Sequence, residues 1–511
     1  MKKINWSGLY KKEDWLTVWA GLLIILIIVV GIPIKLPKLK WATDREFETT
    51  MIRNLPAIDK LIQKASEKNE TDLQELASAL KKTMELNDRK AIRGASKNLG
   101  NLAIEIEDGD LSKVSSKLAS EISSETRAEI SSVFMPANLG WVLVTGLLLM
   151  IVAAIAVALM GINMMRFAKA FLLLFLLTIF SLFIAGNSTI SYYGLEYVIW
   201  CLLIGLFISN VTGIPEFLRP AIRTEFYVKT GVVILGAGIL LTEIINAGIY
   251  GLVQAIFVVT VIWYSCYWIA RKLKIDDEFA AILSSAVSIC GVSAAIATAG
   301  AIKGDPKKLS YTTSIVLICA VPMLILQPII AKFFNMPDLV AGAWLGGTLD
   351  TSGSVVAAGS LINETAMKTG IIVKMSQNVL IGVAAFILSI VWAMKSDDPI
   401  PGTKRKVSAM EIWYRFPKFV IGFILVSLLF SFILSPQVVE STKTTLAGLR
   451  TWWFALAFMS IGLETRFTDL VKLGGGKPAL AFIIAQAINV IWTLLLAYLI
   501  FGGILWPVPK I

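Results

Sequence analysis

Long apolar segments recur along most of this chain and constrain its fold more than any other feature. Most of them can cross a hydrocarbon core about 30 Å thick, because a helix rises about 1.5 Å per residue. They lie near residues 15–36, 139–162, 168–185, 193–213, 226–245, 247–270, 277–302, 311–334, 338–362, 366–394, 416–435, 451–465 and 478–502. The sequence therefore predicts an all-α polytopic membrane protein whose transmembrane domain covers residues 139–511.

Composition excludes several kinds of function. Of the 511 residues, 56% are hydrophobic and 16% are charged, and histidine is absent. Without histidine there is no His-ligated metal site, no Ser-His or Cys-His nucleophile and no histidine proton relay. The net charge of +11 is typical of basic cytoplasmic loops, and no basic run carries the interleaved aromatics of a nucleic-acid site. We expect no enzymatic activity, metal, cofactor or nucleic-acid partner.

The N-terminal part combines an anchor with a polar insertion. In residues 1–36, lysines precede the first apolar segment, which favours an uncleaved signal anchor over a cleaved signal peptide. Residues 37–138 are rich in Lys, Glu, Asp and Ser, and their apolar residues recur every three to four positions. This periodicity predicts amphipathic helices, without any catalytic motif. We expect an extracytoplasmic helical domain that serves as a cap or an assembly module.

Two apolar segments, 277–302 and 338–362, differ from the rest because Ala, Gly, Ser and Thr dominate them. Small residues allow close backbone approach and broken helices. The run that starts at Ser293 also matches the run that starts at Ser352, small residue for small residue. Such a pair of Gly-interrupted segments is the sequence pointer to the binding site of a transporter.

Loop charge indicates how these two segments lie. The lysines at 303, 307 and 308 and the basic run 404–406 all fall on the cytoplasmic side if both segments are re-entrant hairpins. About eleven spans then remain, with the N-terminus inside and both the C-terminus and residues 37–138 outside. A weaker match between Gly238–Gly248 and Gly462–Gly474 favours inverted repeats, although its chain order differs from that of the two segments. Broken helices that cross the membrane fully are the alternative.

The hairpin tips are the candidate substrate site. A helix break exposes backbone N–H groups and the positive end of a helix dipole, which bind small oxyanions, and nearby hydroxyls replace the hydration shell. The substrate-binding candidates are Ser288, Cys290, Gly291, Val292 and Ser293 in the first tip and Thr348, Thr351, Ser352, Gly353 and Ser354 in the second. The alternative is that these residues only loosen helix packing.

Asp350 is the most informative single residue, because a carboxylate at membrane depth is costly and is therefore a functional hypothesis by default. We expect it to carry the coupling ion, H⁺ or Na⁺. Lys374 lies about 15 Å into the next span, close to Gln377 and Asn378. Lys374 pairs with Asp350, attracts the anion or snorkels to the surface. Three further mid-span amides are expected to form interhelical hydrogen bonds: Gln254, Gln486 and Asn489.

Three stretches resemble a known family. SICGVSAAIATAGAIKGDPKKLSYTTSIV, GGTLDTSGSVVAAG and GIIVKMSQNVL are similar to motifs of the sulfate exporter family of bacterial inner-membrane proteins, which is named for a presumed activity. The resemblance covers residues 139–502 and implies the cation/proton antiporter and anion transporter superfamily, with inverted repeats and elevator-type movement. The chain has Asp350 where the family has histidine, Ser354 where it has glutamine, and Gln377 where it has a basic residue. Substrate and coupling ion are therefore expected to depart from the family's.

The leading hypothesis is a secondary active transporter in the bacterial inner membrane, assembled as a homodimer. Its substrate would be a small anion (sulfate-like, sulfonate-like or another small oxyanion), coupled to H⁺ or Na⁺. One alternative is a cation/proton antiporter of the same fold, with Asp350 as the cation ligand. Another is a membrane-anchored sensor or assembly protein that works through residues 37–138.

Overall fold

The protein is built from helices. The computed structural model describes residues 11–106, 108–192, 195, 197–238, 241–302, 304–395, 418–465 and 476–509. These described residues contain two isolated β-bridges and no β-strand. Eight helical segments among them are long and apolar enough to cross a membrane. The prediction of an all-α polytopic membrane protein is confirmed, whereas the count of eleven spans stays a prediction.

The chain divides into two compact units. Unit 1 contains the described residues up to Ile34, Leu148–Thr178 and the described residues from Cys201 on, and unit 2 contains Lys35–Leu147 and Ile179–Trp200. Helices with residues in both units are α8 (Pro136–Leu159), α9 (Met164–Ala185) and α11 (Tyr197–Phe207).

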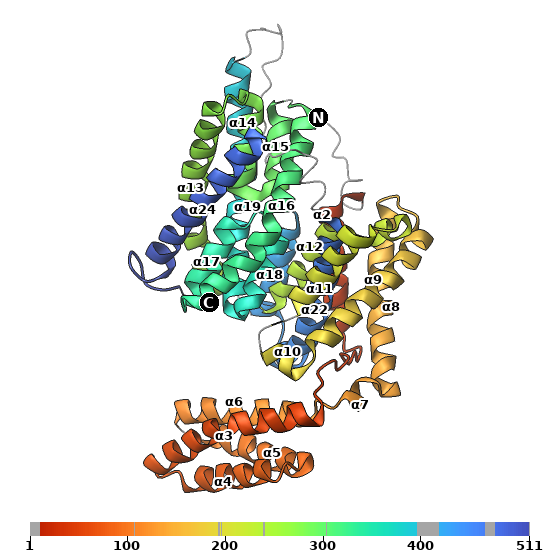
Figure 1. The fold of residues 1–511 in the computed structure, drawn as a ribbon, viewed down its shortest axis with the longest axis vertical. Coiled ribbons are helices and arrows are strands. Elements are labelled where there is room, and N and C mark those ends of the chain that lie inside the picture. Colours follow the sequence, from red (N-terminus) through yellow and green to blue (C-terminus); the bar gives the residue numbers. More distant parts are fainter. Residues whose placement is uncertain are drawn as a thin grey trace. The chain divides into compact units, whose positions relative to one another are not determined.

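Unit 2 contains four amphipathic helices (Figure 1). They are α3 (Asp44–Glu67), α4 (Thr71–Glu85), α5 (Arg89–Glu105) and α6 (Gly109–Thr126), and the unit also has the short α7 (Ile130–Val133) and α10 (Ser188–Tyr192). Their apolar faces form one buried cluster. Helix α3 starts with a capping box between Thr43 and Glu46. The backbone N–H of Ala42 donates to the carbonyl of Ala128 at 2.8 Å, so the chain enters and leaves the four-helix segment at one point.

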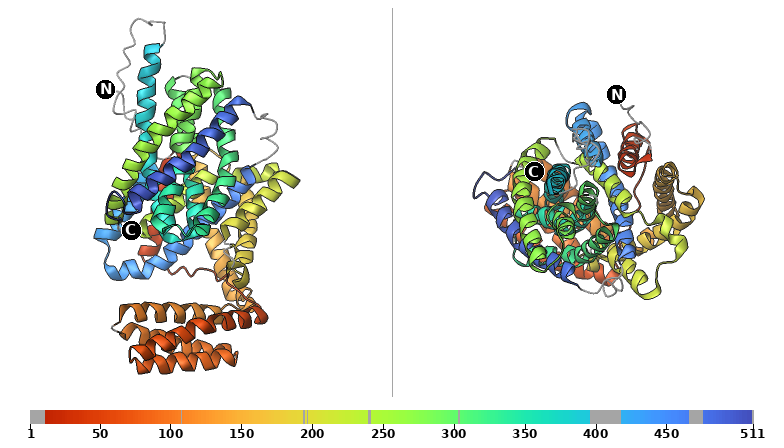
Figure 2. Two further views of the ribbon diagram at one scale, coloured as in Figure 1. Left: turned by 60° about the vertical axis from the view of Figure 1, so that its left-hand side comes forward. Right: turned by 90° about the horizontal axis from the view of Figure 1, so that it is seen from above.

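The helices of unit 1 form two bundles (Figure 2). The anchor bundle consists of α2 (Glu13–Val29), α12 (Thr224–Leu235), α21 (Lys418–Leu428) and α22 (Pro436–Glu464), which pack on one another. The hairpin bundle consists of both small-residue segments with α13 (Leu241–Lys272), α16 (Pro306–Phe333), α19 (Glu364–Lys395) and α24 (Lys477–Phe501). One buried apolar cluster runs through the hairpin bundle.

Helix α11 packs against α22 with backbone on backbone. A Cβ atom added at Gly205 would lie 2.7 Å from the carbonyl oxygen of Met459, and one added at Gly462 would lie 2.6 Å from that of Leu202. No side chain fits between the two helices at this point. The hydroxyl of Ser209 also donates to the carbonyls of Gly462 and Thr465, at 3.0 and 2.8 Å.

The first small-residue segment folds back on itself. It consists of α14 (Asp277–Ser285), the π-helical turn η4 (Ala286–Cys290) and α15 (Gly291–Ile302). Beyond α15, the backbone N–H of Asp305 donates to the Glu278 carboxylate, and Lys308 pairs with that carboxylate at 3.2 Å. The end of α15 therefore lies beside the start of α14. The segment is long enough to span a membrane, but its two ends lie together, as in a re-entrant hairpin.

The second segment is also a hairpin. It consists of α17 (Asp338–Thr348) and α18 (Ser352–Ile362), and both arms lie against the same turn of α19. A Cβ at Gly342 in α17 would lie 2.5 Å from the Ala366 carbonyl oxygen, and one at Gly359 in α18 would lie 2.5 Å from the Cα of Met367. The first hairpin precedes α16 and the second follows it, so they enter the bundle from opposite ends of that helix (Figure 1).

The hairpin geometry agrees with the charge argument and not with the alternative of fully crossing broken helices. Other parts of that argument fall outside the described residues, namely Lys303 and the basic run 404–406. The weaker pair of glycine-rich segments is also described only in part, because residues 239–240 and 466–475 lie outside. The inverted repeats therefore stay a prediction.

Candidate functional site

The two hairpin tips meet at Gly291 and Asp350. A Cβ atom added at Gly291 would lie 3.1 Å from both the Cβ and the carbonyl oxygen of Asp350, and 2.6 Å from Cγ1 of Val316. The φ angle of Gly291 is +33°, a conformation that side-chain-bearing residues rarely adopt. Glycine is therefore required here for two reasons: it allows the turn between η4 and α15, and it leaves room for the contact between the tips.

Two side chains of α19 donate hydrogen bonds to the backbone of the tips. The Nζ of Lys374 donates to the carbonyl of Ile289 at 2.6 Å and to Oε1 of Gln377 at 3.0 Å. The Nε2 of Gln377 donates to the carbonyls of Ser288 at 2.8 Å and Gly347 at 3.4 Å. Gln377 thus links the first hairpin to the second. Lys374 is only 2% exposed, so it does not snorkel to the surface.

Asp350 lies between α17 and α18, in the tip of the second hairpin. Its side chain is 2% exposed, and its Oδ2 has no hydrogen-bond partner among the described residues. No ion pair within 4.0 Å joins it to Lys374 in the described part of the chain. Asn378 is equally buried, and its Oδ1 also lacks a partner there. A buried acceptor without a donor is costly, and a ligand can supply the missing donor or cation.

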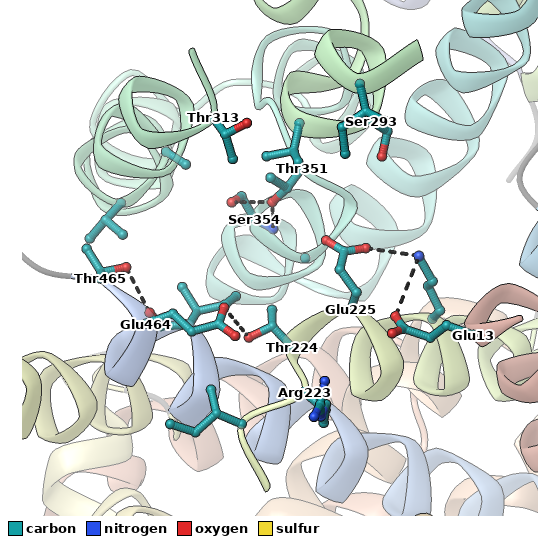
Figure 3. A pocket seen from close by; sticks show the side chains of 18 residues that line it. Glu13, Arg223, Thr224, Glu225, Ser293, Thr313, Thr351, Ser354, Glu464 and Thr465 are labelled. Atoms are coloured by element: carbon teal, nitrogen blue, oxygen red, sulfur yellow. Dashed lines mark hydrogen bonds and ion pairs between the residues drawn. The ribbon is translucent and has the colours of Figure 1, made fainter. Parts of the chain in front are cut away.

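Two adjoining cavities of about 410 Å³ each lie between the tips and the anchor bundle. Figure 3 shows the first of them, with Ser293, Thr313, Thr351 and Ser354 along one side and Glu13, Thr224, Glu225 and Glu464 along the other. Asp350 and Asn378 line the second cavity. The residues that line both cavities are Glu225, Lys229, Val292, Ser293, Ile296 and Thr351.

Two helices begin at the cavities. α15 starts at Gly291, and α18 starts at Ser352, with Thr351 as its N-cap. The Thr351 hydroxyl accepts from the N–H of Ser354 at 3.0 Å and lies 2.7 Å from the Ser354 hydroxyl. The first N–H groups of an α-helix have no partner within the helix, and the helix dipole adds a partial positive charge there. Both N-termini therefore offer donors for an anion.

The predicted site residues divide into two sets. Those that line a cavity are Cys290, Val292, Ser293, Asp350, Thr351, Ser352, Gly353, Ser354 and Asn378. Those that line neither cavity are Ser288, Gly291, Thr348, Lys374 and Gln377. The hydroxyl of Ser288 donates to the carbonyl of Ser284, and that of Thr348 to the carbonyl of Trp344, each at 2.7 Å. Each hydroxyl thus bonds to a carbonyl of its own hairpin, and the Thr348 hydroxyl also accepts from Nε2 of Gln327 in α16 at 3.0 Å.

The mid-span amides brace the hairpin backbones. Gln486 donates to the carbonyl of Thr348 at 2.8 Å, and Asn489 donates to that of Val287 at 3.3 Å. Gln254 donates to the carbonyl of Ala343 at 2.8 Å. They are interhelical hydrogen bonds, and they satisfy carbonyls near the helix breaks.

The sequence prediction missed the charged side of the cavities. Lys229 in α12 pairs with Asp14 at 2.9 Å, Glu225 at 3.3 Å and Glu13 at 3.9 Å. Glu464 lines the first cavity and accepts from the Thr224 hydroxyl at 2.9 Å. The i,i+4 spacing of Glu225 and Lys229 at the start of an apolar segment was an available signal. The contribution of the N-terminal anchor had no such signal.

The chain was compared with known proteins. The family model described as "Conserved hypothetical protein 698" matches residues 169–482. The chain belongs to this family. A UPF0324 membrane protein of Rhodopirellula baltica is 42% identical over 380 residues, which cover 71% of this chain and 68% of that protein.

Two further UPF0324 membrane proteins are similar. One from Nitratidesulfovibrio vulgaris is 38% identical over 68% of this chain and 62% of its own length. Another, from Nitrosomonas europaea, is 34% identical over 57% of this chain and 66% of its own length. The chain thus spans about two thirds of the length of these relatives. Their names state a membrane protein and no activity, and no solved structure matches the chain.

Proposed function

We propose that the chain is a secondary active transporter for a small solute that carries an oxyanion group, coupled to H⁺ or Na⁺. The observation that carries this proposal is the meeting of two oppositely entering hairpins at Gly291 and Asp350, beside two cavities, within segments that are expected to lie in the membrane. A purely structural bundle has no reason to keep a carboxylate and broken helices there. Membership in a family of membrane proteins agrees with this proposal.

The donors at the tips support an oxyanion group. The N-termini of α15 and α18 and the hydroxyls of Ser293, Thr351 and Ser354 line the cavities from the hairpin side. Backbone N–H groups and hydroxyls bind oxyanions without a basic side chain. Arg223 and Lys229 line the opposite side and add positive charge, although carboxylates neutralise Lys229. We keep sulfate-like and sulfonate-like groups within this proposal.

The packing of unit 1 supports an elevator-type mechanism. The helices within the anchor bundle pack closely on one another, and so do those within the hairpin bundle, whereas the candidate site lies where the two bundles face each other. A sliding movement of the hairpin bundle would carry both tips together, because Gln377 links them. The proposal places the protein in the bacterial plasma membrane as a homodimer.

The environment of Asp350 supports its role in coupling. Asp350 and Asn378 each have a side-chain oxygen without a partner among the described residues, and both residues line the second cavity. A proton on Asp350, or Na⁺ bound to both oxygens, would satisfy these acceptors. Anion binding next to an ionised Asp350 is disfavoured by repulsion, so cation and anion would bind cooperatively.

Cation/proton exchange is the second candidate. One observation favours it, namely that Glu13, Asp14, Glu225, Asp350 and Glu464 all line the cavities. Such a lining attracts cations more than anions. The sites of the two candidates are the same, and only the transported species differs.

One transport assay tests both candidates. The full-length chain would be reconstituted in proteoliposomes and exposed to a panel of inorganic oxyanions, organic acids with and without an amino group, and monovalent cations, with imposed pH or Na⁺ gradients. We expect oxyanion transport that depends on one of the gradients. Gradient-driven cation transport without an effect of any oxyanion would favour the second candidate, and the absence of both would contradict the proposed function.

A further inference from the structure

The lining of the second cavity combines donors and acceptors within a few residues of chain. Asp350 precedes α18 directly, and Thr351 and Ser352 follow it at the N-terminus of that helix. Ser293, from the first turn of α15, lines the same cavity and is exposed to it. The cavity therefore offers two helix N-termini and two serine hydroxyls next to a carboxylate. An anion alone would bond to the donors but would leave the carboxylate without a partner.

The unpartnered groups at the cavity are acceptors. Oδ2 of Asp350 and Oδ1 of Asn378 both lack a donor among the described residues, although each side chain is only 2% exposed. Two of the three N–H donors of Lys374 are bonded to Ile289 and Gln377, and no ion pair within 4.0 Å joins Lys374 to Asp350 in the described part of the chain. An ammonium group carries three N–H donors and a positive charge, so it has enough donors for both acceptors and the charge that a carboxylate binds.

The charge around the cavities also disfavours a plain anion. The carboxylates that line them are Glu13, Asp14, Glu225, Asp350 and Glu464, and the cationic side chains are Arg223 and Lys229. Five carboxyl groups thus face two cationic side chains. A solute that carries only negative charge meets a net repulsion in such a lining, whereas a solute with both charges does not.

We propose that the substrate is a small zwitterion whose anionic group binds the N-terminus of α18 and whose ammonium group binds Asp350 and Asn378. This inference rests on the proposed transport function and specifies the substrate class. For such a substrate, unlike the plain anion considered above, the ammonium group and the coupling cation occupy the same carboxylate, so they compete for it and do not bind cooperatively. Zwitterion and H⁺ (or Na⁺) would consequently exchange across the membrane in opposite directions.

Three matched sets of compounds test the substrate class. ω-Amino acids of two to five carbons carry both charges, the corresponding plain carboxylic acids lack the ammonium group, and the corresponding alkylamines lack the carboxylate. β-Alanine, propionate and propylamine form one such set. Binding to the purified full-length protein would be measured by calorimetry, and counterflow would be measured in proteoliposomes. We expect at least one ω-amino acid to bind about 10-fold or more tightly than either of its matched analogues, as one ionic contact provides.

Variants assign the two ends of the zwitterion. Asp350→Asn should lower affinity for the ω-amino acid about 10-fold or more and leave affinity for the plain acid equal or higher, because it removes only the ammonium partner. Ser352→Ala should weaken the binding of both acids. Glu364→Gln is the control, since Glu364 pairs with Lys368 and Arg450 and lines neither cavity. Circular dichroism and melting temperature would verify that each variant folds.

The outcomes separate this inference from the proposed function. Equal or tighter binding of the plain acids by the wild-type protein would overturn the zwitterion assignment and leave an oxyanion transporter. An ω-amino acid preference that survives Asp350→Asn would also overturn the assignment. If neither the amino acids, the plain acids nor inorganic oxyanions bind or are transported, then both the inference and the proposed function are wrong.

Discussion

Lys374 donates a 2.6 Å hydrogen bond to the carbonyl oxygen of Ile289, and thereby fixes a buried positive charge behind the first hairpin tip. Ile289 belongs to the π-helical turn η4, one residue before η4 ends at Cys290 and the chain turns at Gly291. A charged donor on such a carbonyl is stronger than a neutral one. Lys374 therefore has a structural function that is distinct from pairing with Asp350.

This relationship predicts the effect of Lys374→Met. The substitution keeps an apolar chain of similar length but leaves the Ile289 carbonyl and Gln377 Oε1 without this donor, so we expect a loss of about 1–3 kcal/mol in stability. A lower melting temperature in detergent would show it. Lys368→Met on the same helix is the control, because Lys368 makes only a 3.8 Å ion pair with the exposed Glu364. An increase in melting temperature for Lys374→Met would mean that the buried charge destabilises the fold, and would contradict the stabilising role of this hydrogen bond.

Gly291→Ala is expected to separate the two tips. The new methyl group would overlap Val316 and press on Asp350, in a backbone conformation that already disfavours alanine. We expect a stability loss of about 1–3 kcal/mol, together with loss of transport. Gly248→Ala in α13 is the matched control, since a Cβ at Gly248 meets nothing within 4 Å and Gly248 lines neither cavity. Normal melting temperature and transport in Gly291→Ala would contradict the tip contact.

Asp350→Asn is expected to uncouple transport from the cation gradient. Coupling free energies of about 1–3 kcal/mol correspond to roughly 5- to 150-fold changes in apparent substrate affinity between low and high H⁺ or Na⁺. The variant should lose this dependence and keep residual exchange. The measurement is apparent affinity in proteoliposomes across pH and Na⁺ concentration. Unchanged dependence in Asp350→Asn would show that Asp350 is a structural polar residue.

The four-helix segment of unit 2 is expected to be dispensable for transport. Ala42 and Ala128 are hydrogen bonded, so a short glycine linker can replace residues 44–126 without moving the flanking chain. We expect this deletion to keep transport in proteoliposomes. A deletion that extends through α2 should abolish transport, because Glu13 and Asp14 line the cavities. Loss of transport in the shorter deletion, with normal folding, would assign the segment an active role.

The stability of unit 2 is expected to depend on pH through Glu46. Burial alone would raise the pKa of Glu46, but hydrogen bonds from the Thr43 backbone and hydroxyl, Thr189 and Asn187 outweigh it and hold the pKa below its usual value of 4.5. A lowered folded-state pKa adds stability that is complete above pH 4.5 and is lost as pH falls through the folded pKa. Hydrogen exchange of α3 from pH 6 to pH 3 would reveal this loss. Glu46→Gln should remove this part of the pH dependence; identical profiles would refute it.

The sequence was sufficient to locate the broken segments and Asp350, for identifiable physical reasons. Small residues at 277–302 and 338–362 stand out because lipid-facing spans are rich in larger apolar residues. A single carboxylate at membrane depth is similarly conspicuous. The sequence could not decide the role of Lys374, because a single lysine inside an apolar span is compatible with pairing to Asp350, attraction of the anion and snorkelling. Only its 2.6 Å bond to Ile289 separates them.

The sequence could not predict the carboxylates of the anchor bundle as part of the site. Glu13 and Asp14 lie more than two hundred residues before Lys229 in the chain, and their ion pairs depend on α2 packing against α12. Long-range packing of this kind leaves no periodic signal. The expected anion site was therefore incomplete, because it included the donors of the tips and none of the acidic groups opposite them.

The contact between Gly205 and Gly462 limits which parts of unit 1 can move. Helices that touch through their backbones, without side chains between them, cannot slide past each other by changing rotamers, as side-chain-lined interfaces can. The hydroxyl of Ser209 adds hydrogen bonds to the end of α22 beside that contact. We expect α11 and α22 to stay a fixed frame through a transport cycle, against which displacement of the tips would be measured.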